Sequence, residues 1–180
     1  RLSAQVRDKT MHRQYVAAVR GTAKESAELC DFLLKDGKTN MVRAVPTNTP
    51  GAKDAKLRYQ KCGEAGELTL VRVRLFTGRS HQIRVQLSHA GLPIWGDARY
   101  GGGKPGQQIA LWAYRLSFRH PTKKEETLSF VAPPPNSGRR KRSRRCTWNI
   151  SATGTTIKCP AAKSGWPPSQ PSSPCSRRCC

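Results

Sequence analysis

Side chains that could bind an anion are concentrated in one short stretch of the chain, TGRSHQIR, at residues 77–84. An alternating apolar and polar segment precedes it and predicts a strand that ends at Phe76, and a segment with helical spacing follows. Arg79, His81 and Gln82 therefore fall at the start of a helix, where unpaired backbone N–H groups attract negative charge. A phosphate group is the ligand that this arrangement predicts.

The helix itself is predicted over residues 80–90, because Ile83, Leu87 and Ala90 recur at helical spacing. Gly91 follows at the position where helices commonly end on a left-handed residue, and a proline comes shortly afterwards. These signals predict a helix with a sharp C-terminal stop.

The N-terminal end of this helix carries two candidate capping residues, Ser80 and Thr77. Arg84 follows one turn after Ser80 and projects from a face other than the apolar stripe. For any single one of these side chains, simple solvation in a first helical turn is the ordinary interpretation. The argument for a binding site depends on the whole string.

The rest of the first 135 residues alternates with period two, which is typical of strands that are buried on one face. Turn-rich pieces join these segments, as antiparallel neighbours require. The predicted fold is α+β, with one mixed, mainly antiparallel sheet and few helices. The expected strands occupy residues 12–21, 28–35, 39–45, 55–62, 66–76, 109–118 and 126–132.

The 180-residue chain has a formal net charge of +22, which favours a polyanionic partner, with nucleic acid ahead of an anionic membrane surface. Residues 1–135 hold 23 basic and all 11 acidic residues, a net charge of +12, and residues 136–180 hold the remaining +10. The first segment is expected to form one domain. The second is rich in Ser, Pro, Cys and Arg and is expected to be disordered.

The basic run at residues 139–145 admits three interpretations: a nucleic-acid-binding arm, a nuclear localisation signal, or a solvated low-complexity extension. Five of the seven cysteines lie in the same segment, but without the C-x-x-C spacing of a zinc site and without a following histidine. No apolar run is long enough to cross a membrane and no signal peptide is apparent. We therefore expect a cytoplasmic monomer without a bound metal, or an organellar or nuclear one in a eukaryote.

Taken as a unit, LFTGRSHQIRVQLSHAGLPIWGDARYG at residues 75–101 resembles the closing motif of the RluA-type pseudouridine synthases, which isomerise uridine in ribosomal and transfer RNA. The resemblance extends outward. HRQYVAAVRG at residues 12–21 is similar to the basic-x-Tyr strand of the family, and residues 111–121 and 126–135 are similar to its last two strands. It covers residues 1 to about 135.

The resemblance implies an isomerisation without any cofactor, on RNA as the partner, with the target nucleotide extruded from its stack. Tyr15 matches the active-site tyrosine of the family. Arg84 matches the arginine that pairs with the catalytic aspartate. The resemblance therefore implies that the catalytic residues are Arg84 and Tyr15. The residues expected to contact RNA are Arg13, Arg79, His81, Gln82, Lys35 and Lys38.

Each of these residues also has an alternative interpretation without a function. Tyr15 would pack half-buried against the sheet, and Lys35 and Lys38 would be solvated in a hairpin turn. The aspartate of the family lies in a His-Arg-Leu-Asp motif that the chain does not contain. Asp97 corresponds to a structural turn residue of the family. Either the chain is an incomplete copy of an active enzyme, which we expect, or it is a degenerate relative that binds RNA without catalysis.

Overall fold

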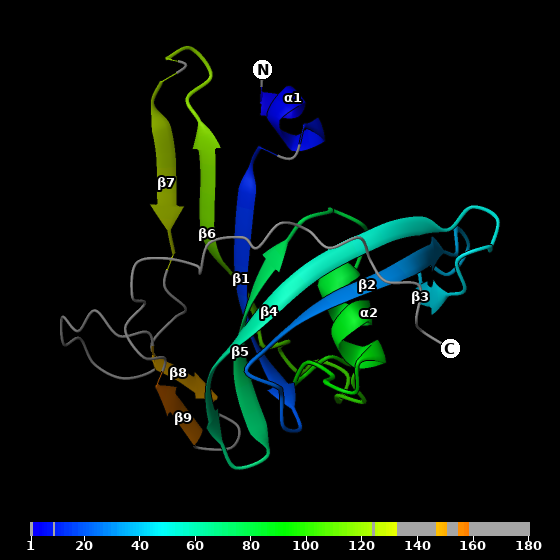
Figure 1. The fold of residues 1–180 in the computed structure, drawn as a ribbon. Coiled ribbons are helices and arrows are strands. Elements are labelled where there is room, and N and C mark those ends of the chain that lie inside the picture. The colour runs from blue at the N-terminus through cyan, green and yellow to red at the C-terminus, as the bar shows by residue number, and fades with distance from the viewer. Residues whose placement is uncertain (1, 9, 124, 133–146, 151–154, 159–180) are drawn as a thin grey trace.

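A computed structural model of the chain describes residues 2–8, 10–123, 125–132, 147–150 and 155–158. Its centre is a seven-stranded sheet in the order β3-β2-β4-β5-β1-β6-β7, in which every pairing between described strands is antiparallel (Figure 1). The predicted α+β class is confirmed. The expected parallel component of the sheet is absent from the described strands.

Helix α2 and the strands lie close to their predicted positions. The strands do so because period-two alternation marks strands that bury one face. The helices are α1 (Leu2–Arg7) and α2 (Gln82–His89). The strands of the large sheet are β1 (His12–Arg20), β2 (Ser26–Lys35), β3 (Val42–Val45), β4 (Lys53–Ala65), β5 (Leu68–Leu75), β6 (Leu111–Arg119) and β7 (Thr127–Val131).

A separate two-stranded sheet pairs β8 (Thr147–Ile150) with β9 (Thr155–Lys158) in antiparallel register. These two strands lie within residues 136–180, for which disorder stays a prediction. The remainder of that segment lies outside the described residues.

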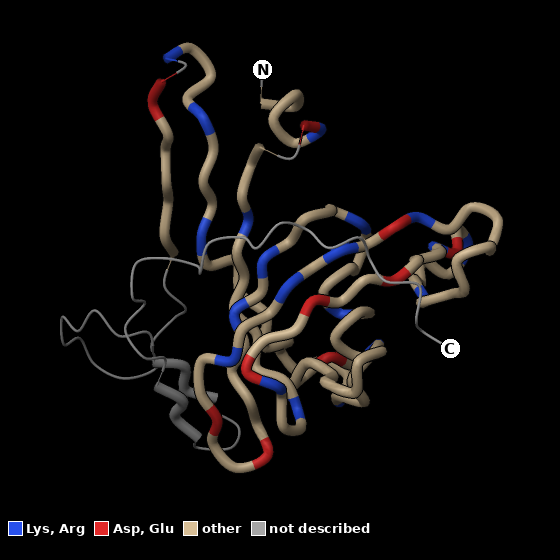
Figure 2. The backbone as a smooth tube through the Cα atoms, in the orientation of Figure 1, with Lys and Arg blue, Asp and Glu red and all other residues tan. Residues whose placement is uncertain are grey.

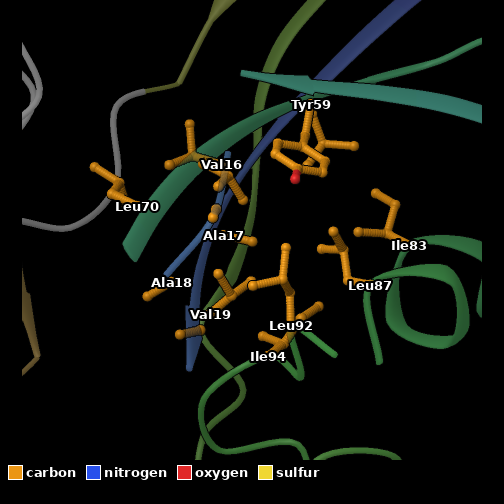
Figure 3. Packing of buried hydrophobic residues seen from close by; sticks show 14 of the residues in the cluster. Val16, Ala17, Ala18, Val19, Tyr59, Leu70, Ile83, Leu87, Leu92 and Ile94 are labelled. Atoms are coloured by element: carbon orange, nitrogen blue, oxygen red, sulfur yellow. The ribbon is translucent and has the colours of Figure 1, made fainter. Parts of the chain in front are cut away.

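Helix α2 packs against one face of the sheet and closes the main core. Figure 3 shows Tyr59 of β4 directed toward Ile83 and Leu87 of α2. Leu87 is fully buried and Ile83 is 5% exposed, as their helical spacing predicts. The apolar stripe of the helix thus fixes which of its residues remain available for other contacts.

The C-terminal end of α2 follows the predicted pattern. Gly91 adopts a left-handed φ of 74°, its N–H donates to Ser88 O at 3.0 Å, and the N–H of Leu92 donates to Leu87 O at 2.8 Å. This pair of bonds is the Schellman motif. It turns the chain back toward β1, where Ile94 bridges Val19.

Candidate functional site

The loop between β5 and α2 has a different N-terminal cap from the predicted one. The capping residue is His81, with a left-handed φ of 51° and no hydrogen bond from its side chain to the helix. The prediction of Ser80 or Thr77 as N-cap is wrong. Thr77 is buried, and its hydroxyl donates to Gln82 Oε1 at 2.9 Å and accepts from the N–H of Lys56 at 2.9 Å. The hydroxyl therefore attaches the loop to β4.

Gln82, predicted to contact RNA, has a side chain that is committed to the interior. It is 2% exposed, and its Oε1 also accepts the N–H of Arg79 at 3.0 Å. Its Nε2 donates to Lys56 O at 3.1 Å and to Gln86 Oε1 at 2.9 Å. With both ends of the amide engaged, Gln82 supports the shape of the loop that presents Arg79.

Gln86 continues this buried polar chain, and sequence reasoning did not single it out. It is completely buried, and its Nε2 lies 2.8 Å from Asp31 Oδ2 and 3.2 Å from the carbonyl oxygens of Leu29 and Ala55. Two glutamines four residues apart on one helical face were the available signal. Together they connect α2 to β2 and β4.

Arg84 lies in an ion pair with Asp97. Its Nε donates to Asp97 Oδ2 at 2.8 Å and its Nη2 donates to Oδ1 at 2.7 Å, so the contact is bidentate. The guanidinium carbon also lies 4.9 Å from the centre of the Tyr100 ring. Sequence spacing alone could not place a carboxylate of this chain opposite Arg84, and the structure brings Asp97 there.

Asp97 has the structural turn role that the sequence indicated for it. Its side chain is fully buried, and its Oδ1 accepts the N–H groups of Arg99 at 3.0 Å and Tyr100 at 3.1 Å. Turn formation and the pairing with Arg84 are therefore performed by the same carboxylate. The turn fixes the position of the Asp97 carboxylate, and that carboxylate fixes the orientation of the Arg84 guanidinium.

The charges of this pair stabilise one another. Burial alone raises the pKa of Asp97, but the hydrogen bonds from Arg84, Tyr100 and Arg99 outweigh it and leave that pKa below its ordinary value. The hydrogen bond to Asp97 raises the pKa of Arg84. Both groups are charged at neutral pH.

The bidentate contact occupies one edge of the Arg84 guanidinium. Five N–H groups are available on a guanidinium, and Asp97 receives two of them, from Nε and Nη2. The side chain of Arg84 is 22% exposed, whereas that of Asp97 is 0% exposed. The two N–H groups of Nη1 and the second N–H of Nη2 make no hydrogen bond within the described part of the chain, and the side chain is partly exposed.

Tyr15 lies on the same face of the sheet as α2. It is opposite Val73 in the β1–β5 pairing, Val73 is opposite Tyr59 in the β4–β5 pairing, and residues opposite one another share a face. Tyr59 points toward α2 in Figure 3. Tyr15 is half-buried and lines a largely apolar cavity of about 460 Å³ with residues of β6 and β7. Arg84 does not line this cavity.

Two basic cavities flank the loop at Gly78 and Arg79. The first, of about 350 Å³, is lined by Lys35, Lys53, Arg79 and Ser80 among others. The second, of about 330 Å³, lies against α1 and the start of β1. The basic residues that line the second cavity are Arg7, His12, Arg13, Arg74 and Arg79.

Arg79 lines both cavities, and Asp54 holds it in place. Its Nη2 donates to the carboxylate oxygen Oδ1 of Asp54 at 2.7 Å, and its Nε donates to the backbone carbonyl oxygen of Asp54 at 2.8 Å. Gly78 lets Arg13 approach, because a Cβ at Gly78 would lie 2.8 Å from Arg13 Nη2. Lys35 lines the first cavity. Lys38 instead lies in an exposed turn, where its backbone N–H donates to Asp36 Oδ1 at 2.8 Å. The structure thus brings Arg13, Arg79 and Lys35 to one loop and leaves Lys38 apart.

His81 lies among positive charges. Burial, then the charges of Arg84, Arg99 and Lys35, lower the pKa of His81. Its Nδ1 lies 2.9 Å from the hydroxyl of Tyr100, which also accepts the N–H of Val42 at 3.0 Å. The positive potential around this ring suits an anionic ligand.

The described residues offer neither a membrane-spanning helix nor a metal centre. Neither α1 nor α2 is long and apolar enough to cross a membrane. Nowhere in the described part of the chain do three or more His, Cys, Asp or Glu side chains gather so as to hold a metal ion. The polar chemistry of this part is carried instead by guanidinium, amide and carboxylate groups.

Curated relatives resemble most of the chain. An uncharacterized RNA pseudouridine synthase of Chlorobaculum parvum is 36% identical over 157 residues, which cover 75% of this chain and 47% of the relative. The ribosomal large subunit pseudouridine synthase C of Vibrio parahaemolyticus is 34% identical and is matched over 73% of this chain and 43% of its own length. The chain spans about half the length of these relatives.

The fold agrees with solved structures. Human RNA pseudouridylate synthase domain containing 1 superposes with a TM-score of 0.60 and 18% sequence identity, over 74% of this chain and 58% of that protein. The profile of the family described as RNA pseudouridylate synthase matches residues 1–89, which include the loop at Arg79 and Arg84. The chain belongs to the RNA pseudouridylate synthase family, as a relative of its RluA-type members.

Proposed function

We propose that this chain is part of an RNA pseudouridine synthase, in which it supplies RNA-binding side chains and the arginine that orients the reacting carboxylate. The observation that carries the proposal is the geometry of Arg84. Asp97 fixes one edge of its guanidinium, the other N–H groups make no hydrogen bond within the described residues, and the side chain is 22% exposed. A fixed and partly exposed guanidinium is suited to hold a second carboxylate ionised and aimed.

The proposed reaction is an isomerisation of uridine. The bond between ribose C1′ and uracil N1 breaks, the base turns, a bond between C1′ and C5 forms, N1 gains a proton and C5 loses one. Substrate and product have the same composition and oxidation state, so the balance requires no redox cofactor. The carboxylate would come from a His-Arg-Leu-Asp motif like that of the family, and the N–H groups of Arg84 that do not bond Asp97 would receive it.

The target nucleotide must leave its stack to reach such a site. Tyr15, which lies on the face of the sheet that also carries α2, lines an apolar cavity, and its ring would offer a surface for the extruded base. Arg13, Arg79 and Lys35 border the two basic cavities and would hold the neighbouring phosphates. His81 would join them, and Lys38 would contact RNA farther along.

Ribosomal RNA is the proposed substrate class, because the relative from Vibrio parahaemolyticus bears the name of a ribosomal large subunit pseudouridine synthase. Transfer RNA is the alternative within the same chemistry. We place the protein in the cytoplasm, where ribosomes are assembled in bacteria, and propose that it acts as a monomer.

A fusion protein tests the proposal. The segment of a curated relative that contains His-Arg-Leu-Asp is fused upstream of Arg1, and tritium release is measured from ribosomal RNA that carries 5-tritiated uridine. Release is expected from the fusion and not from this chain alone. Arg84→Ala in the fusion should abolish release and retain most of the RNA affinity, whereas Arg79→Ala should weaken RNA binding. Release that persists in Arg84→Ala would contradict the proposed role of Arg84.

The two basic cavities also support a second candidate function, a basic RNA-binding module without catalysis. In that case the fusion releases no tritium. Arg84→Ala would then weaken RNA binding no more than Arg79→Ala does. The same set of variants therefore separates the two functions.

A further inference from the structure

A row of basic side chains crosses the face of the sheet opposite α2. In the strand pairings, Arg58 of β4 lies opposite Arg74 of β5, Arg74 lies opposite Gln14 of β1, and Gln14 lies opposite Arg115 of β6. Residues opposite one another share a face, so these four side chains project from one side. Four strands at about 4.8 Å spacing give the row a length of about 14 Å. We call it the outer basic row.

The outer basic row lies on the face away from α2 because side chains alternate along each strand. Tyr59 of β4 and Val73 of β5 are buried in the core that α2 closes. Arg58 and Arg74 are their immediate neighbours along the chain and therefore point the other way. Figure 2 shows basic positions continuing across β4, β5, β1 and β6.

Folding alone does not account for two arginines placed directly opposite one another. Like charges at such a position destabilise a sheet, and burial together with the charge of Arg58 lowers the pKa of Arg74. Glu28, which continues the row on β2, pairs with Lys56 at 2.7 Å. Within the described part of the chain, no ion pair is found for Arg58, Arg74 or Arg115.

An aromatic ring organises Arg74 of the row together with a neighbouring lysine, Lys56. The Phe76 ring lies 5.3 Å from the guanidinium carbon of Arg74 and 5.6 Å from Nζ of Lys56, at distances typical of cation–π contacts. Arg74 Nη2 is also 3.5 Å from Nδ1 of His12. These contacts limit the conformations of the cations before any ligand arrives, which lowers the entropic cost of binding.

The row connects with the loop of the candidate site at the C-terminal end of β5, a central strand of the sheet. Arg74 belongs to the row and also lines the cavity that contains Arg13 and Arg79, and Arg79 in turn lines the cavity of Lys35. A continuous cationic path therefore leads from the α2 face, past the loop at Gly78, to the opposite face.

We propose that the outer basic row binds the phosphate backbone of the RNA substrate, so that RNA held in the basic cavities at Arg79 continues around the end of β5 onto the face opposite α2. The inference rests on the proposed function for the identity of the polyanion. The row combines cations with an amide and has an aromatic ring covered by two cations. Such a surface suits phosphates rather than a protein partner, whose interfaces have an apolar core.

The test compares two double variants of the full chain. Arg58→Gln with Arg74→Gln removes two charges from the row, and Lys24→Gln with Lys104→Gln removes two exposed charges from turns elsewhere. Binding to a ribosomal RNA fragment is measured by fluorescence anisotropy between 50 and 200 mM salt. The logarithm of the affinity falls with the logarithm of the salt concentration, and each phosphate contact to a single strand contributes roughly 0.7 to the steepness of that fall. The slope of the row variant should therefore be less steep than that of the unmodified chain by about 1.4.

The control variant is expected to keep the slope of the unmodified chain. Equal slopes for the two double variants, with RNA binding intact and unchanged circular dichroism, would overturn the outer basic row as an RNA surface and leave the proposed function standing. An unmodified chain that binds no RNA would instead overturn the proposed function. Binding of the row to phosphatidylserine vesicles or an acidic protein, without the loss of slope on RNA, would also overturn the inference.

Discussion

Asp97 and Arg84 form a bidentate pair in which the carboxylate is fully buried and the guanidinium is 22% exposed. The two partners therefore depend on one another unequally. Water can hydrate an arginine whose carboxylate has been removed, whereas the carboxylate is inaccessible to water in the folded protein. This asymmetry has measurable consequences for stability.

Arg84→Leu is expected to destabilise the fold by about 3–5 kcal/mol, because it leaves Asp97 charged and buried without its partner. Asp97→Asn should cost less, about 1–3 kcal/mol, because the asparagine oxygen can still accept the N–H groups of Arg99 and Tyr100. Urea denaturation of the two variants measures both values. Equal losses would contradict the description of Asp97 as the dependent partner.

Gln82 and Arg79 are expected to separate stability from RNA binding. Gln82→Leu should lower the free energy of unfolding by about 1–3 kcal/mol, since it leaves the buried hydroxyl of Thr77 and the carbonyl of Lys56 without the amide. Arg79→Gln should change stability by less than about 1 kcal/mol, because its ion pair with the exposed Asp54 is on the surface. RNA affinity should fall in Arg79→Gln.

This comparison also tests the direct contact to RNA that sequence reasoning predicted for Gln82. Anisotropy measured well below the unfolding temperature separates the two effects. A loss of RNA affinity in folded Gln82→Leu as large as that in Arg79→Gln would favour the direct contact over the supporting role.

The stability of the fold should decrease as the pH falls below the ordinary histidine pKa of about 6.5. Burial and the nearby charges of Arg84, Arg99 and Lys35 lower the pKa of His81 in the folded state, so the unfolded state binds more protons in the window below that value. The stability that neutral His81 contributes is therefore fully present at pH values above its pKa in the unfolded state. It is lost as the pH falls through the lower pKa of His81 in the folded state.

His81→Asn isolates this effect, because asparagine tolerates the left-handed φ of 51° but does not titrate. The variant should show a weaker loss of stability between neutral pH and pH 5 in urea titrations. His12, whose pKa is also lowered by burial and by Arg74, provides the residual dependence, and His12→Gln is the control that retains His81. An unchanged pH profile in His81→Asn would contradict the assignment.

The sequence predicted most of the sheet, because alternation along a strand is a local property. The strand predicted at 12–21 is observed as His12–Arg20, and the helix end at Gly91 follows from its backbone freedom. The helix start was missed because His81 caps it by backbone conformation and without a side-chain hydrogen bond. A capping residue of that kind has no compositional signature.

The contacts of the site could not be derived from local patterns. Asp97 follows Arg84 by 13 residues across a turn, so neither helical nor strand spacing relates them. The outer basic row requires the register of four strands, which alternation alone leaves undetermined. Lys35 and Arg79 were singled out from sequence, but their common cavity depends on the packing of β2 against the loop before α2.

Gly96 and Gly91 form a matched pair for measuring how tightly the turn around Asp97 is packed. Both have a left-handed φ, 77° and 74°, so alanine at either position carries similar backbone strain of about 1 kcal/mol. At Gly91 no atom lies within 4 Å of the added Cβ, whereas at Gly96 the Cβ would collide with the backbone carbonyl of Gln108. The two variants therefore differ mainly in that collision.

Gly91→Ala should lower the free energy of unfolding by about the strain alone, roughly 1 kcal/mol. Gly96→Ala should lower it by at least about twice that amount, since backbone atoms must shift. Because the shift occurs next to Asp97, the Gly96 variant should also disturb the orientation of Arg84 and reduce turnover in the fused enzyme, while Gly91→Ala leaves turnover near that of the parent. Equal effects of the two alanines on stability would mean that the turn yields at little cost and does not hold Asp97 rigidly.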